Sequence, residues 1–161
     1  TVYRDKKYFR FDQVLHIQKK VHFNADADRY KTFVAIEQLK LRGYNTLCPD
    51  YPQPKWFYDM CDKAGMFVIE RMNLNSPTNS NIRTVGGTPA NDPALLEEYM
   101  TRAKAMYYRS RNHSGIIAYN LGSENSGNGY NMYKVYEWIK SVETERPVFY
   151  EGAEGEWNTD L

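Results

Sequence analysis

The sequence has only two cysteines, no paired histidines and no long apolar run. Cys48 and Cys61 stand apart in apolar surroundings. They form neither a disulfide framework nor a metal-binding pattern, so we expect buried, unreactive thiols. The three histidines show none of the spacings typical of a zinc site. No stretch stays apolar over the roughly 20 residues that a membrane-spanning helix needs. These absences predict no membrane partner and no metal-stabilised or disulfide-stabilised domain.

An excess of charge of one sign is also lacking. The 161 residues carry 21 lysines and arginines against 20 aspartates and glutamates, a net charge of +1. This balance provides no field that would attract nucleic acid or an anionic membrane. The length and the 42% hydrophobic content suit one domain with its own core. Aromatic residues are plentiful at 15%, with 14 tyrosines. They favour a core of polar-tipped rings, and a surface that stacks on sugars is the alternative.

Short apolar runs alternate with amphipathic segments along the chain. Helices are predicted at 29–42, 55–64, 92–109 and 130–141. Strands are predicted at 21–23, 45–48, 66–72, 116–121 and 147–150. Each strand–helix unit takes about thirty residues, as parallel crossovers require. The pattern predicts a parallel α/β sheet, either open or part of a barrel, because a complete (β/α)₈ barrel needs about 250 residues.

We expect the whole chain to form a single domain. Its expected parts are an N-terminal hairpin, the strand–helix units and a polar tail, at 1–20, 21–150 and 151–161. The hairpin is predicted from two strand-like runs, Tyr8–Phe11 and Val14–Ile17. The long polar segment 73–91 is rich in Asn, Thr, Gly and Pro. A loop of this length is usually functional or disordered.

The chemistry is expected at the stretch from Ile116 to Asn131, which reads I-I-A-Y-N-L-G-S-E-N-S-G-N-G-Y-N. It begins as a buried strand and breaks into a loop of Gly, Ser and Asn. A single carboxylate, Glu124, stands at the break. A strand that ends in a flexible polar loop with one acid is where α/β barrels place their catalytic groups. Taken without its context, Glu124 would be a solvated surface acid.

Four long motifs give the chain a family resemblance. They are Y-P-Q-P-K-W-F-Y-D-M-C-D-K-A-G-M-F-V-I-E (51–70), R-S-R-N-H-S-G-I-I-A-Y-N-L-G-S-E (109–124), S-G-N-G-Y-N (126–131) and E-R-P-V-F-Y-E-G (145–152). In this order they resemble the catalytic barrel of family 2 glycoside hydrolases, closest to the β-galactosidases. The resemblance implies a partial (β/α)₈ TIM barrel of about five strands. It also implies retaining hydrolysis of a terminal β-galactoside, with Glu124 as the general acid/base.

The resemblance also implies that part of the catalytic machinery is missing. In the family the nucleophile is a second Glu from a later strand, beyond Leu161 here. Because a retaining glycosidase needs two carboxyl groups about 5–5.5 Å apart, we expect this chain alone to be inactive. Substrate contacts are expected from residues at two strand ends, namely Ser123, Tyr119, Asn120 and Asn73.

Several positions depart from the family pattern. Ser123 stands where the family has Asn, and one residue is inserted after Glu124. Cys48 stands where an Arg supports the site. Asn75 and Pro77 replace the Glu and His that bind magnesium in some members, so we expect no metal and no cofactor.

Two alternatives to a working hydrolase remain. One is a non-catalytic or engineered barrel fragment that self-associates, because a five-strand sheet has two open edges and a parallel sheet is normally covered on both faces. The other is a carbohydrate-binding remnant, suggested by the tyrosines and by segment 73–91. The expected partners are a carbohydrate and either a second copy or the remainder of the barrel.

Overall fold

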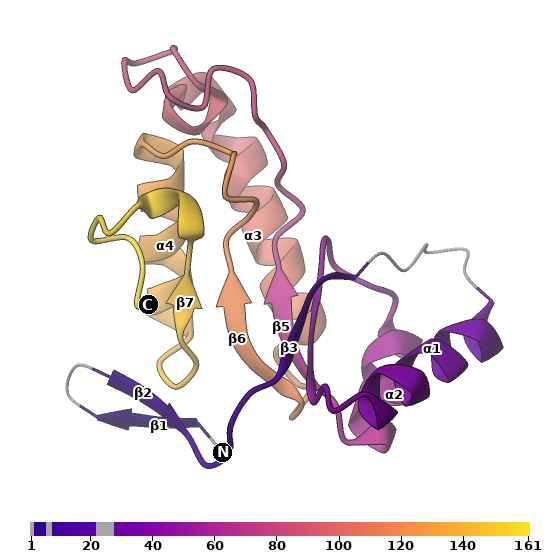
Figure 1. Ribbon diagram of the computed structural model, residues 1–161. Helices are drawn as coiled ribbons and strands as arrows, with labels where there is room; N and C mark the ends of the chain where they lie inside the picture. Colours follow the sequence, from indigo (N-terminus) through magenta and orange to yellow (C-terminus); the bar gives the residue numbers. More distant parts are fainter. Residues whose placement is uncertain (1, 6–7, 22–27) are drawn as a thin grey trace.

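A computed structural model describes residues 2–5, 8–21 and 28–161 of the chain. Within them, one sheet has five parallel strands in the order β3-β4-β5-β6-β7 (Figure 1). The strands are β3 (Ile17–Val21), β4 (Thr46–Pro49), β5 (Phe67–Arg71), β6 (Ile116–Asn120) and β7 (Val148–Phe149). Helices alternate with them: α1 (Arg29–Leu41), α2 (Lys55–Ala64), α3 (Leu96–Ser110) and α4 (Tyr130–Val142). The predicted partial TIM barrel is confirmed, with boundaries shifted by a few residues at most for these helices and for β4 to β7.

The N-terminal hairpin exists, but its second strand was predicted wrongly. Its strands are β1 (Val2–Asp5) and β2 (Tyr8–Phe11), which pair antiparallel. Residues 14–17 instead lead into β3, because the Asn45 side chain forms hydrogen bonds with the backbone of Val14 and His16. Its amide nitrogen donates to the Val14 carbonyl at 2.7 Å, and its oxygen accepts from the His16 amide at 2.8 Å. The first barrel strand is therefore Ile17–Val21 rather than 21–23, and His22 and Phe23 lie outside the described residues.

The helix ends follow the capping signals in the sequence. The Asp28 carboxylate accepts from the Tyr30 amide at the start of α1. The Asp92 carboxylate accepts from the Ala94 amide and opens a 3₁₀ turn, Pro93–Leu95, that leads into α3. Gly65 ends α2 with a φ of 68°, a left-handed conformation that glycine adopts without strain. Further 3₁₀ turns lie at Pro89–Asn91 and Glu151–Ala153.

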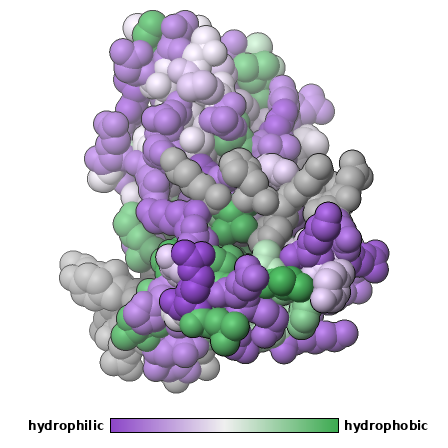
Figure 2. Space-filling view, turned by 45° about the vertical axis from the view of Figure 1, so that its right-hand side comes forward, coloured by the Kyte–Doolittle hydropathy of each residue, from purple (hydrophilic) through white to green (hydrophobic). Residues whose placement is uncertain are grey.

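The two faces of the sheet have different surroundings. The helices pack on one face and form the main core, which includes Leu47, Val68 and Ile116 from the strands. The opposite face carries a smaller apolar cluster around Cys48, Ile69 and Ile117, which no described helix covers. Figure 2 shows hydrophobic side chains gathered in the lower half of the molecule, with polar ones dominating above them. The uncovered face corresponds to the inside of a barrel.

Both cysteines are buried and free. Burial raises the pKa of the Cys48 thiol to about 11 and that of Cys61 to about 12. The predicted burial of both thiols is therefore confirmed, and their lack of reactivity stays a prediction. No helix in the described part of the chain is long and apolar enough to cross a membrane.

Candidate active site at the ends of β5 and β6

Glu124 lies on a turn that is fixed to the neighbouring strand. The Gly122 amide donates to the Asn120 side chain at 3.0 Å, and the Ser123 amide donates to the Leu74 carbonyl at 3.0 Å. Gly122 has a φ of 148°, and a Cβ there would lie 3.1 Å from the Cβ of Leu74. Only glycine allows this close approach without strain. The turn therefore holds the carboxylate of Glu124 at the carboxyl ends of β5 and β6.

Arg71, the last residue of β5, is the cation of this site. Its guanidinium donates to Asp50 at 3.1 Å and lies 4.0 Å from the Glu124 carboxylate. The Arg71 side chain is 8% exposed, so little solvent screens these charges. Sequence reasoning did not single out Arg71. The signal was its place in strand 67–71, since alternation puts it on the same inner face as Ile69 and Phe67.

Three hollows of the surface meet at Glu124. One of about 560 Å³ lies over the inner face of the sheet and includes Cys48, Ile69 and Asn120. A second, of about 500 Å³, lies above the strand ends and includes Asp50, Arg71, Asn73 and Ser123. The third, of about 250 Å³, is formed by loops alone. Among the described residues, only Glu124 lines all three. The Glu124 carboxyl group therefore borders open space on more than one side.

The structure brings most of the predicted site residues to Glu124. Asn120 shares the inner hollow with it, and Asn73 and Ser123 share the hollow above the strand ends. Asn73 is exposed there, while its carbonyl accepts from Arg102 at 2.7 Å.

Tyr119 does not join this group. It is fully buried on the helix-covered face, packed against Tyr107, and its hydroxyl accepts from Arg146 at 3.0 Å. Its neighbour Asn120 faces the hollow, and successive strand residues point to opposite faces. In this structure Tyr119 is a core residue, which corrects its predicted place in the substrate site.

Two other acids at strand ends have distinct surroundings. Glu70 is fully buried on the helix-covered face of the sheet, where the Tyr58 hydroxyl donates a hydrogen bond to its carboxyl group at 2.8 Å. Burial raises the pKa of Glu70 to about 8. Glu151 lines the inner hollow and forms an exposed ion pair with Lys19 at 3.0 Å. Neither acid lies on the turn that holds Glu124.

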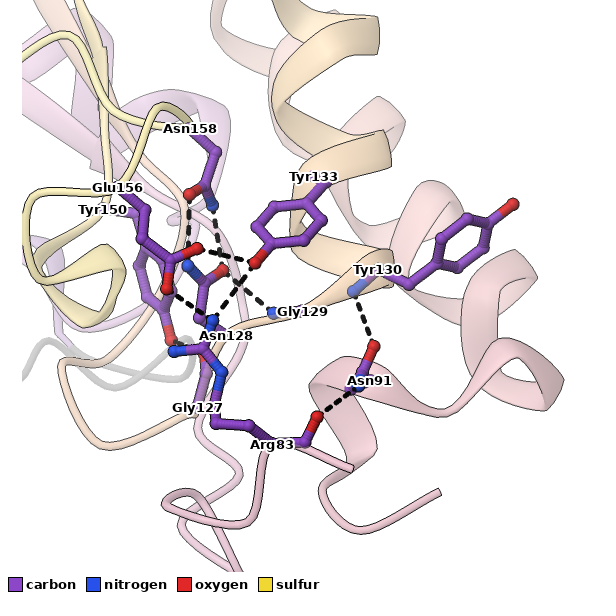
Figure 3. Close-up of polar contacts among 10 residues, drawn as sticks. All are labelled: Arg83, Asn91, Gly127, Asn128, Gly129, Tyr130, Tyr133, Tyr150, Glu156 and Asn158. Carbon is purple, nitrogen blue, oxygen red and sulfur yellow. Dashed lines mark hydrogen bonds and ion pairs between the residues drawn. The ribbon is translucent and has the colours of Figure 1, made fainter. Parts of the chain in front are cut away.

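The loop after Glu124 is tied to two distant segments (Figure 3). The buried side chains of Asn128 and Asn158 donate to each other, at 3.1 and 2.9 Å. The Tyr150 hydroxyl donates to the Gly127 carbonyl at 2.5 Å. On the other side, the Asn91 side chain accepts from the Tyr130 amide at 2.9 Å. The segments 80–91, 125–130 and 150–158 therefore form one hydrogen-bonded unit.

An ion pair reinforces this unit. The Arg83 guanidinium lies 2.5 Å from Glu156, and the Tyr133 hydroxyl donates to the same carboxylate at 2.6 Å. These contacts lower the pKa of Glu156, with the Tyr133 hydrogen bond as the largest cause. Trp157 packs its ring on Tyr133 and Tyr136 while remaining 56% exposed.

The described residues contain no group of three or more His, Cys, Asp or Glu arranged to hold a metal ion. Asn75, at the position of a magnesium ligand in some family members, is exposed and lines the hollow above the strand ends. The absence of a metal and a cofactor stays a prediction from the sequence.

Comparison with known proteins identifies the family. Residues 28–161 match the model described as glycosyl hydrolases family 2, TIM barrel domain. A β-galactosidase of Lactococcus lactis subsp. lactis (strain IL1403) is 37% identical over 124 residues, which are 74% of this chain and 12% of that protein. One of Enterobacter cloacae is 37% identical over 123 residues, 73% of this chain and 11% of that protein. The chain thus spans about an eighth or less of the length of these relatives.

Solved structures show the same fold. A β-glucuronidase from an uncultured Clostridium sp. superposes with a TM-score of 0.74 at 20% identity, covering 93% of this chain and 28% of that one. A β-D-glucuronidase of Dictyoglomus thermophilum gives a TM-score of 0.72 at 21% identity, with the same coverage of 93% and 28%. At this identity the likeness concerns the fold alone. The family match, the β-galactosidase relatives and the parallel sheet agree, and the chain belongs to glycosyl hydrolase family 2, within whose TIM barrel domain residues 28–161 fall.

Proposed function

We propose that this chain supplies the acid/base half of a retaining β-galactosidase-type site, with Glu124 as the general acid/base. One observation carries the proposal. Glu124 stands at the carboxyl end of β6, on a turn locked by Gly122, where three hollows meet. This is the end of the strands at which TIM barrels perform chemistry. The β-galactosidase relatives favour a β-galactoside as substrate.

The proposed reaction assigns two steps to Glu124. First, its carboxylic acid donates a proton to the glycosidic oxygen while a second carboxylate attacks the anomeric carbon and the leaving group departs as an alcohol. Then the Glu124 carboxylate removes a proton from water, which attacks the anomeric carbon and frees the second carboxylate. Asp50 holds the Arg71 guanidinium in place through a hydrogen bond. In this position the guanidinium lies 4.0 Å from the Glu124 carboxyl group and orients it. The hollow above the strand ends would receive the sugar, with Asn73 and Ser123 on its wall.

We assign the second carboxylate to a residue outside these 161. Asp50 faces the same hollow, but it is engaged by Arg71 at 3.1 Å. Glu151 belongs to the inner hollow and pairs with Lys19. The inner face lacks the strands that would close a barrel in the described part of the chain. It follows from this proposal that the 161 residues alone do not turn over a glycoside.

The test uses the complete gene product that carries these residues. With a nitrophenyl β-galactoside, Glu124→Ala should lower kcat by about 10²–10⁴-fold, the usual contribution of a general acid/base. Azide should restore turnover, because it attacks the glycosyl-enzyme without needing a base, and the product should be a β-galactosyl azide. Glu145→Gln is the matched control, since Glu145 is an exposed acid at the opposite end of the sheet. Unchanged turnover in Glu124→Ala would refute the assignment.

Self-association is a second candidate, and the inner face favours it. The side chains of Ile69, Ile117 and Phe149 leave an apolar hollow of about 560 Å³ without a covering helix among the described residues. The β7 edge is less available, because the Asp160 amide donates to the Val148 carbonyl and the Asp160 carboxylate accepts from the Val148 amide. Light scattering of the 161-residue chain tests this. A dimer that Ile69→Glu converts to a folded monomer supports it, and a wild-type monomer contradicts it.

A further inference from the structure

Segment 50–53 lies between β4 and α2 and brings two side chains to the hollow above the strand ends. These side chains belong to Asp50 and Tyr51. Prolines stand at positions 52 and 54, on either side of Gln53. Because proline has no amide hydrogen, Gln53 has the only backbone donor in this stretch of three residues. The placement of the segment therefore depends on the hydrogen bonds of Gln53.

Gln53 is buried and uses its backbone to attach the segment to two helices. Its amide donates to the Tyr58 hydroxyl at 2.7 Å, and its carbonyl accepts from the Arg109 guanidinium at 3.3 Å. Its side-chain nitrogen donates to the Tyr51 carbonyl at 2.9 Å and so fixes the segment internally. Tyr58 belongs to α2 and Arg109 to α3. Segment 50–53 is thus attached to the helical layer at one residue.

The end of β5 holds this segment from both faces of the sheet. On the helix-covered face, the Tyr58 hydroxyl that accepts from Gln53 donates to the Glu70 carboxyl group at 2.8 Å. On the inner face, the Arg71 guanidinium donates to Asp50 at 3.1 Å. Glu70 and Arg71 are successive residues of the strand, so their side chains point to opposite faces. The two residues therefore hold the two ends of segment 50–53.

The second oxygen of the Glu70 carboxyl group shows which protonation state suits this arrangement. Glu70 Oε2 is buried without a hydrogen-bond partner among the described residues, as is Gln53 Oε1. An unpaired charged oxygen in the core is far more costly than an unpaired neutral one. Burial also raises the pKa of Glu70, to about 8. The closed arrangement of the segment is therefore that of protonated Glu70.

The titratable groups that face Glu70 include one cation. They lie on α2, α3 and β6 and are Tyr58, Cys61, Arg109 and Tyr119. Burial raises the pKa of the two tyrosines and of the thiol, so these groups stay neutral. An ionised Glu70 attracts Arg109, which also binds the Gln53 carbonyl. Ionisation therefore competes with the attachment of the segment, and a loop opens to water more readily than a packed helix.

We propose that the hydrogen bonds from Gln53 through Tyr58 to Glu70 position Asp50, and that this attachment weakens as Glu70 loses its proton. Asp50 in turn binds Arg71, whose guanidinium lies 4.0 Å from Glu124. Tyr58 and Glu70 line none of the three hollows at Glu124, so they are positioning residues. Their effect on catalysis rests on the proposed function of Glu124. The attachment itself can be measured without turnover.

Hydrogen exchange followed by mass spectrometry measures the attachment in the complete gene product. The open segment lets Glu70 ionise at its ordinary pKa, so opening releases a proton between about pH 5 and pH 8. After correction for the intrinsic rate, exchange in segment 50–54 should accelerate by up to about tenfold per pH unit over this window. Glu70→Gln stays neutral and keeps an acceptor for Tyr58, so its corrected exchange should not depend on pH. Equal acceleration in both proteins would overturn the proposal.

The kinetic experiment uses a dinitrophenyl β-galactoside, whose leaving group departs without a proton. Its kcat then reports the step in which Glu124 acts as a base, and a rising pH preserves the basic form. The wild-type kcat should fall above about pH 8, where Glu70 ionises even in the closed segment, and KM should not change. Glu70→Gln should retain its kcat up to pH 9. Tyr58→Phe loses both hydrogen bonds of the hydroxyl and should lower kcat about ten- to hundredfold.

Tyr107→Phe is the matched control for Tyr58→Phe. Tyr107 is also buried on the helix-covered face, but its hydroxyl donates to the Val142 carbonyl, at 2.9 Å, rather than to the attachment of segment 50–53. This variant should lose stability and keep its kcat. Equal losses of kcat in the two variants would show that Tyr58 acts only through the stability of the core, which would overturn its positioning role.

The two measurements separate this inference from the proposed function. If Glu124→Ala leaves turnover unchanged while Glu70→Gln removes the pH dependence of exchange, the attachment is supported and only its catalytic effect is lost. If Glu124→Ala lowers kcat but exchange in wild-type segment 50–54 does not depend on pH, this inference alone is overturned.

Discussion

Arg71 and Glu124, from adjacent segments of the sheet's carboxyl edge, approach to 4.0 Å. The same guanidinium binds Asp50 after β4 at 3.1 Å. One nearly buried cation thus links the end of β4, the end of β5 and the loop after β6. Cys48, a position at which the family resemblance led us to expect an Arg, lines the inner hollow beside Arg71. At this edge, the cation that contacts Asp50 and Glu124 belongs to β5.

Removing Asp50 tests how much this link contributes. Asp50→Ala leaves the Arg71 guanidinium nearly buried without its closest acceptor, so we expect the free energy of unfolding to fall by about 1.5–3 kcal/mol. Asp50→Asn should lose less, because the amide oxygen still accepts. Urea denaturation measures both. Asp59→Ala, at an acid that is 49% exposed on α2, is the control. Equal stability of all four proteins would show that the pair is not structural.

Gly122→Ala should disturb the turn that presents Glu124. A Cβ at a φ of 148° is strained, and it would lie 3.1–3.2 Å from the side chain and carbonyl of Leu74. We expect a loss of about 1–3 kcal/mol in unfolding free energy. In the complete gene product, kcat should fall more than KM changes, because the acid is displaced.

Gly65→Ala is the matched control for this prediction. Gly65 also has a positive φ, 68°, but a Cβ there meets nothing closer than the Lys40 amine at 3.9 Å. It should cost about 1 kcal/mol of stability and leave kcat unchanged. A similar loss of kcat in both variants would mean that Gly122 acts only through global stability.

Much of the fold was predictable because its signals are local. The caps Asp28 and Asp92, and Gly65 after α2, mark helix ends by their own hydrogen bonds and backbone conformation. The continuous apolar strands reflect burial on both faces of a parallel sheet. Glu124 was found because strand ends in such folds carry chemistry.

The wrong or missed predictions concern residues whose positions are set by contacts with distant parts of the chain. The Asn45 side chain forms hydrogen bonds with Val14 and His16, which are 31 and 29 residues away. Because of these bonds, residues 14–17 do not form the second strand of the predicted hairpin. The face of the sheet on which the Tyr119 side chain lies depends on the register of β6. This register shifts at a bulge where β6 pairs with β5. Arg71 was overlooked because its partners, Asp50 and Glu124, lie in the loops that follow β4 and β6.

Tyr119→Phe tests the corrected position of this residue. The buried hydroxyl accepts from Arg146 at 3.0 Å, so its loss should lower the unfolding free energy by about 1–2 kcal/mol. Because the ring lies on the helix-covered face, KM for a galactoside in the complete gene product should not change. Tyr51→Phe, at a tyrosine that lines the hollow above the strand ends, is the comparison. A higher KM in Tyr119→Phe at unchanged stability would restore Tyr119 to the substrate site.

Glu70 should make the stability of the chain fall as the pH rises. Burial raises its pKa from 4.5 to about 8 in the folded protein, so between these values the folded state binds a proton that the unfolded state has lost. The free energy of unfolding should then decrease from about pH 5 to pH 8, by up to about 1.4 kcal/mol per pH unit.

Glu70→Gln keeps a partner for the Tyr58 hydroxyl and removes the titration. Denaturation at pH 5, 6.5 and 8 should give a flatter profile for Glu70→Gln than for wild type, with the variant more stable at pH 8. Glu145→Gln, at an exposed acid, should follow the wild-type profile. Parallel profiles for Glu70→Gln and wild type would show that Glu70 is ionised throughout in the folded chain.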